Sequence, residues 1–414
     1  MIKKLKSFVL NNFLILFTIY YCTLFLDTSS LEIDYPPIEI ISKIIRYAIY
    51  ILLFIRLISI LPCYKEDISK AKWKEKPIFV KFIYFLIIIM MISLTINFIT
   101  TKNKRMLFLM LLLMSSYKTD YRKIIKSTMN LQIILTSVLV LLSILGITQN
   151  YIVPRGKISR YSLGFVYTTN LAQMIAFSSI LYLYNQGSKI KIRELFIMQL
   201  MNAFAYFITD SRTEFIMLQV VIGLTIMWKA LKRIDKEKIL KNAKKIYSYI
   251  FSRSFIIYPI ISLIIVMCYP SGGIWNNINS ALSNRLKQTY DNIEYYGIRP
   301  FGDDVELLGL GLKEKIKYGS YKSNYIDNEY IQMVFKEGYI FAICFIILIN
   351  VLLIILYKRK KYKDVMLCSL YLLFGLLNPR IVNILYCPIL FMIIPEVIEY
   401  CKTSEINVNG EIYW

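Results

Sequence analysis

Arginine residues recur in short polar segments of this 414-residue chain, each beside a long apolar run. Arg155 and Arg160 precede one such run, Arg212 lies between two runs with almost no loop, and Arg285 and Arg380 fall in later polar segments. A guanidinium group is planar and permanently charged, and it can grip a phosphate through two parallel hydrogen bonds. These arginines are therefore candidates for binding a phosphate-bearing ligand.

The segment that carries Arg155 and Arg160 leads directly into an expected helix. Helix N-termini attract anions, because their first backbone N–H groups are unpaired and the helix dipole is positive there. The two arginines thus predict a clamp for a diphosphate. Interfacial arginines that snorkel toward lipid phosphates would give the same pattern, so this second interpretation stays open.

The turn Thr209-Asp-Ser-Arg-Thr-Glu214 joins two apolar runs. Ser211 and Glu214 match a capping box, which gives both residues a structural role. The cation of Arg212 in the first helical turn is unfavourable by about 0.3–1 kcal/mol. An anion bound beside Arg212 would offset this cost, so the turn favours a ligand site.

Carboxylates near these arginines are the candidates for acid–base chemistry. The chain has no histidine, the side chain that most often acts as a general acid or base. Asp327 is the first candidate for a catalytic base, and Asp210 and Glu214 follow it. Capping of the next helix explains Asp327 equally well.

Three more arginines have competing interpretations. Arg285 opens an expected amphipathic helix that ends near Tyr295, and it would be an ordinary surface charge if no ligand meets it. Arg46 and Arg56 lie within an apolar run, where cations are rare and usually functional. Arg46 is the stronger candidate for substrate binding, since Arg56 can snorkel toward the inner surface.

Membrane-spanning helices are the elements that must position these residues. The chain has 57% hydrophobic residues, and its apolar runs do not alternate as membrane strands would. Many runs approach the roughly 20 residues that a helix needs to cross a bilayer. We predict an all-α integral membrane protein, a single domain over residues 1–414, with about twelve transmembrane helices at residues 8–26, 38–60, 78–100, 106–117, 131–149, 166–184, 194–209, 213–229, 254–270, 338–357, 364–378 and 381–400.

The charge pattern orients these spans. The net charge of +23 comes from short basic clusters between apolar runs, as the positive-inside rule predicts, so we expect no nucleic-acid partner. With both termini in the cytoplasm, 30 Lys and Arg fall on the inner side and 16 on the outer side. Half of the outer cations lie in one long extracytoplasmic loop, residues 270–337, between spans nine and ten. Arginine supplies 7 of the 16 outer cations but only 5 of the 30 inner ones, which marks the outer face as the ligand side.

The order of these motifs resembles the Wzy-type polymerases of capsular and O-antigen repeat units, which are related to the O-antigen ligases. The resemblance covers about residues 80–400. Six fragments carry it: Arg160-Tyr-Ser-Leu-Gly-Phe165, Asp210-Ser-Arg-Thr213, Asn284-Arg-Leu286, Tyr296-Gly-Ile-Arg-Pro-Phe-Gly302, Ile326-Asp-Asn-Glu-Tyr330 and Lys336-Glu-Gly338.

This resemblance implies a C-type glycosyltransferase fold in the bacterial cytoplasmic membrane. Such an enzyme would join undecaprenyl-diphosphate-linked oligosaccharide repeat units at the outer face. Outer arginines would neutralise the departing lipid diphosphate, and a carboxylate would orient or deprotonate the acceptor hydroxyl. Related ligases use a histidine that this chain lacks, so that role passes to a carboxylate or lapses. The expected partners are membrane lipids, a flippase and a chain-length regulator.

Two alternatives remain for the function. One is a flippase or transporter of lipid-linked oligosaccharides, which would more often show repeated halves and short outer loops. The other is an O-antigen-type ligase, which the missing histidine disfavours. The chain contains no Walker or dinucleotide motif, and we expect neither a cofactor nor a metal.

Overall fold

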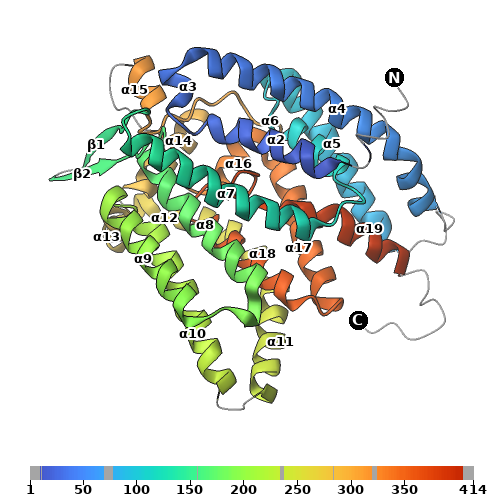
Figure 1. The fold of residues 1–414 in the computed structure, drawn as a ribbon. Coiled ribbons are helices and arrows are strands. Elements are labelled where there is room, and N and C mark those ends of the chain that lie inside the picture. Colours follow the sequence, from blue (N-terminus) through green and yellow to red (C-terminus); the bar gives the residue numbers. More distant parts are fainter. Residues whose placement is uncertain are drawn as a thin grey trace.

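The computed structural model is mostly helical and includes a two-stranded hairpin (Figure 1). It describes residues 10, 12–69, 78–155, 157–233, 237–282, 284–318 and 324–403. The N-terminal part consists of α2 (Phe13–Leu26), α3 (Leu31–Asp34), α4 (Pro36–Ser69), α5 (Ile78–Thr101), α6 (Arg105–Ser115) and α7 (Tyr121–Ile144).

The hairpin of β1 (Ile152–Arg155) and β2 (Ile158–Tyr161) follows α7, and its antiparallel register pairs Val153 with Arg160. The helices after the hairpin are α8 (Thr168–Gln186), η2 (Gly187–Lys189), α9 (Ile192–Thr209), α10 (Arg212–Arg233), α11 (Glu237–Ser254), α12 (Ile257–Cys268), η3 (Tyr269–Ser271), α13 (Ile274–Ala281), α14 (Arg285–Tyr296), α15 (Leu312–Tyr318), α16 (Glu329–Glu337), α17 (Tyr339–Lys358), α18 (Tyr362–Phe374), η4 (Pro388–Met392) and α19 (Ile393–Thr403).

Several of these helices are long and apolar enough to cross a membrane. Within the described ranges five pass this test: Pro36–Tyr64, Phe79–Thr101, Tyr121–Ile144, Arg212–Ala230 and Tyr339–Lys358. A sixth is counted if α11 and α12, which bend by 59° at their junction, form one broken span. Large apolar side chains of α4, such as Ile44, Ile51 and Phe54, are more than half exposed, which suits contact with lipid. The fold is thus consistent with the predicted all-α membrane protein, while twelve spans remain a prediction.

The last predicted span, residues 381–400, is wrong as one continuous helix. After α18 the backbone is irregular from Gly375 to Cys387, and η4 and α19 follow it. Pro379 and Pro388 explain the interruption, because proline lacks a backbone N–H and disfavours helix in the residue before it. The segment is largely buried, which is the condition under which irregular backbone is tolerated at membrane depth.

The long loop, residues 270–337, is a folded unit in its described parts. It contains α13, α14, α15 and α16, and an apolar cluster that includes Leu286, Ile326 and Phe335 holds it against Val266 of α12. Asn97 of α5 anchors it further, since its Nδ2 donates to the carbonyl oxygens of Phe301 at 2.6 Å and Lys336 at 2.8 Å. The loop is therefore fixed to the apolar helices rather than suspended above them.

Segments assigned to the outer side from sequence contact one another at one end of the helix bundle. The N–H of Val166 donates to Thr28 at 2.9 Å, and the N–H of Leu312 donates to Val166 at 3.0 Å. In Figure 1 this end carries β1, β2, α3 and α15. The connections at the other end of α8 and α18 also meet, because Tyr121 and Tyr184 both donate to Asp364.

Candidate functional site

The centre of the candidate site is an ion pair within the long loop, between the start of α14 and the segment before α16. The Nε of Arg285, the first residue of α14, lies 2.9 Å from Oδ2 of Asp327. Asn328, not Asp327, caps α16, since its side chain accepts from the N–H groups of Tyr330 and Ile331. The capping interpretation of Asp327 is therefore wrong, and its carboxylate faces an arginine instead.

Glu214, in the first turn of α10, is the second carboxylate of this region. Its side chain is buried, and its Oε1 accepts from Nδ2 of Asn378 at 2.8 Å and from Nε2 of Gln173 at 3.4 Å. Arg285 and Asp327 both act electrostatically on Glu214, which places the three charged groups in one neighbourhood.

Gln173 joins this carboxylate to a third element. While its amide nitrogen donates to Glu214, its Oε1 accepts from Nε of Arg380 at 3.0 Å. The Cζ atom of Arg380 also lies 4.8 Å from the ring centroid of Tyr386. A single amide of α8 thus connects Glu214 of α10 with Arg380 of the irregular segment after α18.

Arg160 and Arg212 meet at the turn that precedes Glu214. The Nε of Arg160 donates to the carbonyl oxygen of Thr209 at 2.9 Å. Asp210 is nearly buried and has a left-handed φ of 47°, which reverses the chain between α9 and α10. The Nε of Arg212 lies 3.4 Å from Oδ1 of Asp210, and the Arg212 side chain remains 60% exposed. We call Arg160, Arg212, Arg285, Arg380, Asp327, Glu214 and Asp210 the arginine–carboxylate cluster.

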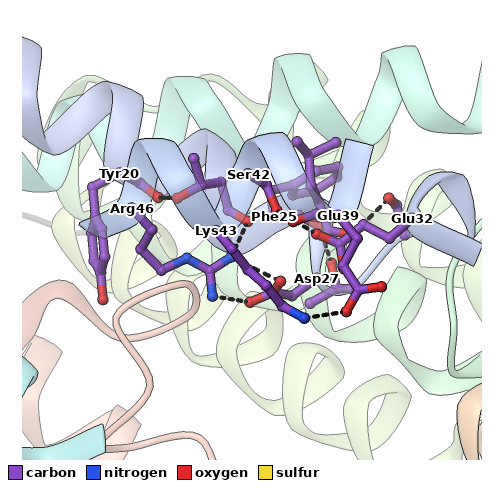
Figure 2. A network of polar contacts seen from close by, with 12 residues as sticks. Tyr20, Phe25, Asp27, Glu32, Glu39, Ser42, Lys43 and Arg46 are labelled. Atoms are coloured by element: carbon purple, nitrogen blue, oxygen red, sulfur yellow. Dashed lines mark hydrogen bonds and ion pairs between the residues drawn. The ribbon is translucent and has the colours of Figure 1, made fainter. Parts of the chain in front are cut away.

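Arg46, a predicted substrate-binding residue, has no contact with this cluster within the described part of the chain. Arg46 forms an ion pair with Asp27 at 2.7 Å and donates to the carbonyl oxygen of Thr23 at 2.9 Å (Figure 2). Arg46 thus ties α4 to the end of α2. The backbone of Arg155 pairs with Ile158 at the end of the hairpin, and its side chain lies outside the described part of the chain.

Figure 2 shows a polar network that surrounds Arg46. Ser42 donates to Glu32 at 2.9 Å, and Lys313 of α15 lies 3.2 Å from the other Glu32 oxygen. Lys43 pairs with Glu39 one turn away. This network fastens the long loop to α3 and α4, so it supports the site without reaching it.

Burial raises the pKa of two carboxylates that lie outside the expected spans. It raises the pKa of Asp327 above the usual aspartate range, although the positive charges of Arg285 and Arg380 act in the opposite direction. Burial also raises the pKa of Glu329, whose Oε2 accepts from the N–H of Ile381 at 3.1 Å. A carboxylate with a raised pKa is a better proton acceptor than an exposed one, so Asp327 suits a general base.

A second charged group lies at the C-terminal end of α16. Burial raises the pKa of Glu337 to about 7, and burial together with the charge of Arg105 lowers the pKa of Lys336 to about 8. Arg105, the first residue of α6, acts on both. These residues border the loop anchor at Asn97, and Arg380 of the arginine–carboxylate cluster also acts on Lys336.

An open cavity of about 510 Å³ lies along α14, the helix that begins with Arg285. Its lining is amide, carboxylate and phenol: Gln288, Asp291, Asn292, Tyr295, Tyr296 and Asn324. Amide and carboxylate groups bond hydroxyls, while exposed tyrosine rings offer flat apolar faces. This composition suits a neutral polyhydroxylated ligand.

Sequence reasoning missed Gln173, Asn378, Glu329 and Tyr386 as parts of this region. Gln173 and Glu329 had a signal in the sequence, because polar residues within or next to apolar runs need buried partners. Tyr386 had none, since a tyrosine in an apolar segment is ordinary.

Searches of protein-family models, curated proteins and solved structures find no match to this chain.

Proposed function

We propose that this chain is a glycosyltransferase that polymerises oligosaccharide repeat units carried on undecaprenyl diphosphate, of the capsule or O-antigen type. It would act at the outer face of a bacterial cytoplasmic membrane, cross it about twelve times and have a C-type glycosyltransferase-like fold. One observation carries the proposal: four arginines that are far apart in sequence lie at or next to carboxylates at one end of the bundle. Arg285 pairs with Asp327 and Arg212 with Asp210, while Arg160 donates to the carbonyl of Thr209 beside Asp210, and Arg380 donates to Gln173, which also contacts Glu214.

In the proposed reaction, a hydroxyl oxygen of the acceptor unit bonds to the anomeric carbon of the donor sugar. The bond from that carbon to the lipid diphosphate breaks, and the diphosphate leaves with the electron pair. Cluster arginines stabilise the negative charge that develops on the leaving oxygen. Asp327 accepts the proton of the acceptor hydroxyl.

The ion pair of Arg285 with Asp327 gives this scheme a starting state. An incoming diphosphate offers Arg285 an anion of higher charge, and two-point contact of guanidinium with phosphate is favourable. Transfer of Arg285 from the carboxylate to the diphosphate frees Asp327 to act as a base. Donor binding and base activation are thus coupled in the proposal.

The cavity along α14 provides the proposed site for the glycan. The helix starts at Arg285 and ends eleven residues later, about 16 Å away at the helical rise. A sugar chain leaving the cluster along α14 would meet Tyr295, whose side chain is 82% exposed, and the amides of Gln288 and Asn292.

Deletion of the gene and analysis of lipid-linked glycans tests the proposal. A polymerase defect leaves single repeat units on the outer face, while a flippase defect leaves them on the inner face. Arg160→Ala and Arg212→Ala should both abolish long chains, and Arg→Lys at either position should be impaired because lysine cannot grip in two places.

Arg299→Ala is the matched control. Arg299 is 60% exposed, as is Arg212, and it pairs with Asp303 in the same loop without contact to the cluster. It should retain long chains. Near-normal polymer from Arg160→Ala and Arg212→Ala, in protein that still reaches the membrane, would overturn the proposal.

A further inference from the structure

A second cavity, of about 520 Å³, lies at the end of the bundle away from the arginine–carboxylate cluster. Five cations line it: Lys361, which pairs with Glu396, and four others, Arg122, Lys244, Lys360 and Lys363. They come from separate elements: the start of α7, the middle of α11, the turn after α17 and the start of α18. The fold thus brings together charges that repel one another.

None of these four cations forms a salt bridge within the part of the chain that the structure describes. The adjacent Lys361 differs, because its Nζ lies 2.5 Å from Glu396. Converging cations that outnumber the carboxylates beside them are stabilised when an external anion enters between them. The cavity is therefore built for a negatively charged ligand.

Asp364 is the carboxylate that lines this cavity, and although it acts electrostatically on Arg122 and Lys363, a single carboxylate offsets only part of the positive charge. It is buried, and its two oxygens accept from the hydroxyls of Tyr121 at 2.8 Å and Tyr184 at 2.6 Å. The aspartate thereby fixes two tyrosines, one from α7 and one from α8. Lys363 lies 4.4 Å from the centroid of the Tyr184 ring, so this framework also orients a cation.

The cavity lies beside the ends of two candidate membrane spans. The candidate span of α7 begins at Tyr121, one residue before Arg122, and that of α17 ends at Lys358, two residues before Lys360. Tyr184 is eleven residues after Gln173 on α8, about 16 Å along the helix from the cluster. Basic pockets between membrane helices at the ends of spans suit phosphate headgroups.

We propose that this cavity binds the phosphate headgroup of an anionic phospholipid from the leaflet at that end of the bundle. The four cations contact the phosphate. The site is independent of the glycan chemistry proposed above.

The test compares two triple variants of the full chain in detergent. Arg122→Gln/Lys244→Gln/Lys363→Gln removes three cavity cations. Lys123→Gln/Lys245→Gln/Lys358→Gln removes three charges at neighbouring positions that do not line the cavity. Each protein receives mixed micelles of phosphatidylcholine and phosphatidylglycerol in equal parts, and native mass spectrometry counts the phosphatidylglycerol retained.

The cavity variant should bind phosphatidylglycerol at least about tenfold more weakly than the wild type, given that each basic residue near an anionic surface contributes a severalfold gain. The control variant should weaken phosphatidylglycerol binding by less than half as much as the cavity variant does. Thermal protection by phosphatidylglycerol, measured against each protein without lipid, separates lost binding from lost stability. Equal retention by both variants would overturn the proposal. Equal protection of the wild type by inorganic phosphate or glycerol phosphate would overturn the assignment to a lipid.

Discussion

Replacement of Gly338 by alanine probes how the long loop is held against the apolar helices. Gly338 lies between α16 and α17 with φ of 91° and ψ of 157°, a region that is essentially restricted to glycine. A Cβ atom there would lie 2.3 Å from the carbonyl oxygen of Pro300, 2.4 Å from Gly302 N and 2.6 Å from the carbonyl carbon of Phe301. All three are backbone atoms, so no side-chain rotation relieves the clash.

The cost of this substitution has two parts. The backbone conformation alone costs an alanine about 1–3 kcal/mol. Residues 300–302 must also retreat, which disturbs the bond from Asn97 to Phe301 at 2.6 Å and its companion to Lys336 at 2.8 Å. Each bond is worth about 1 kcal/mol, so Gly338→Ala should lower the free energy of unfolding by about 3–5 kcal/mol.

Thermal unfolding of the purified protein in detergent measures this effect, with two glycine variants as controls. Gly297 has a φ of +68° but no atom within 4 Å of an added Cβ, so Gly297→Ala carries backbone strain without a clash. Gly223 lies in α10 with open space around it, and Gly223→Ala should stabilise by about 0.4–1 kcal/mol. If Gly338→Ala and Gly297→Ala unfold at the same temperature, the backbone contact does not hold the loop.

Three further substitutions have defined outcomes. Arg56 is buried and donates to backbone carbonyls of two other segments, so Arg56→Leu should destabilise by about 2–4 kcal/mol in the same thermal assay, and an unchanged melting temperature would refute this role. Burial raises the pKa of Glu337 from 4.5 to about 7, so the folded state loses stability as pH rises through that interval. The melting temperature of Glu337→Gln should therefore fall less than that of the wild type between about pH 5 and about pH 7.5. Parallel curves of melting temperature against pH would contradict the burial argument. Asn378→Leu removes the 2.8 Å donor to Glu214 and should shorten the glycan chains relative to the wild type, as read from lipid-linked products on gels; chains of wild-type length would contradict it.

Apolar run length predicted most of the helices but not the end of the chain. The run 338–357 became α17 almost residue for residue, because an uninterrupted apolar segment in lipid has helix as its available conformation. Residues 381–400 are also rich in apolar side chains, yet Pro379 just before them and Pro388 within them interrupt the helix. Mean hydropathy over a window does not register a missing backbone N–H. The positions of the prolines therefore predict the end of this helix better than the mean hydropathy does.

The candidate site was predictable in its charged residues and not in its connections. Arg160, Arg212, Arg285 and Asp327 stood out because each charge sits beside an apolar run. Their pairings depend on tertiary packing: Asp327 and Asn328 are neighbours in sequence, and only the fold assigns the helix cap to one and the ion pair to the other. Gln173, whose amide has one partner on each side, is determined entirely by which helices pack together.

The early end of α18 has a consequence for how the site is assembled. The backbone turns after Phe374 instead of continuing the helix, so the carbonyl oxygens of residues 375–377 accept from other elements: Nη1 of Arg285 donates to Leu377 at 3.4 Å, Nδ2 of Asn328 donates to Leu376 at 3.1 Å, and the N–H of Glu329 donates to Gly375 at 2.9 Å. The turn after α18 therefore supplies backbone acceptors that hold the start of α14 and the start of α16 in place. If the helix continued through residue 381, the N–H groups of Arg380 and Ile381 would bond the carbonyls of Leu376 and Leu377, and the loop would lose these two acceptors while every charged side chain was still present.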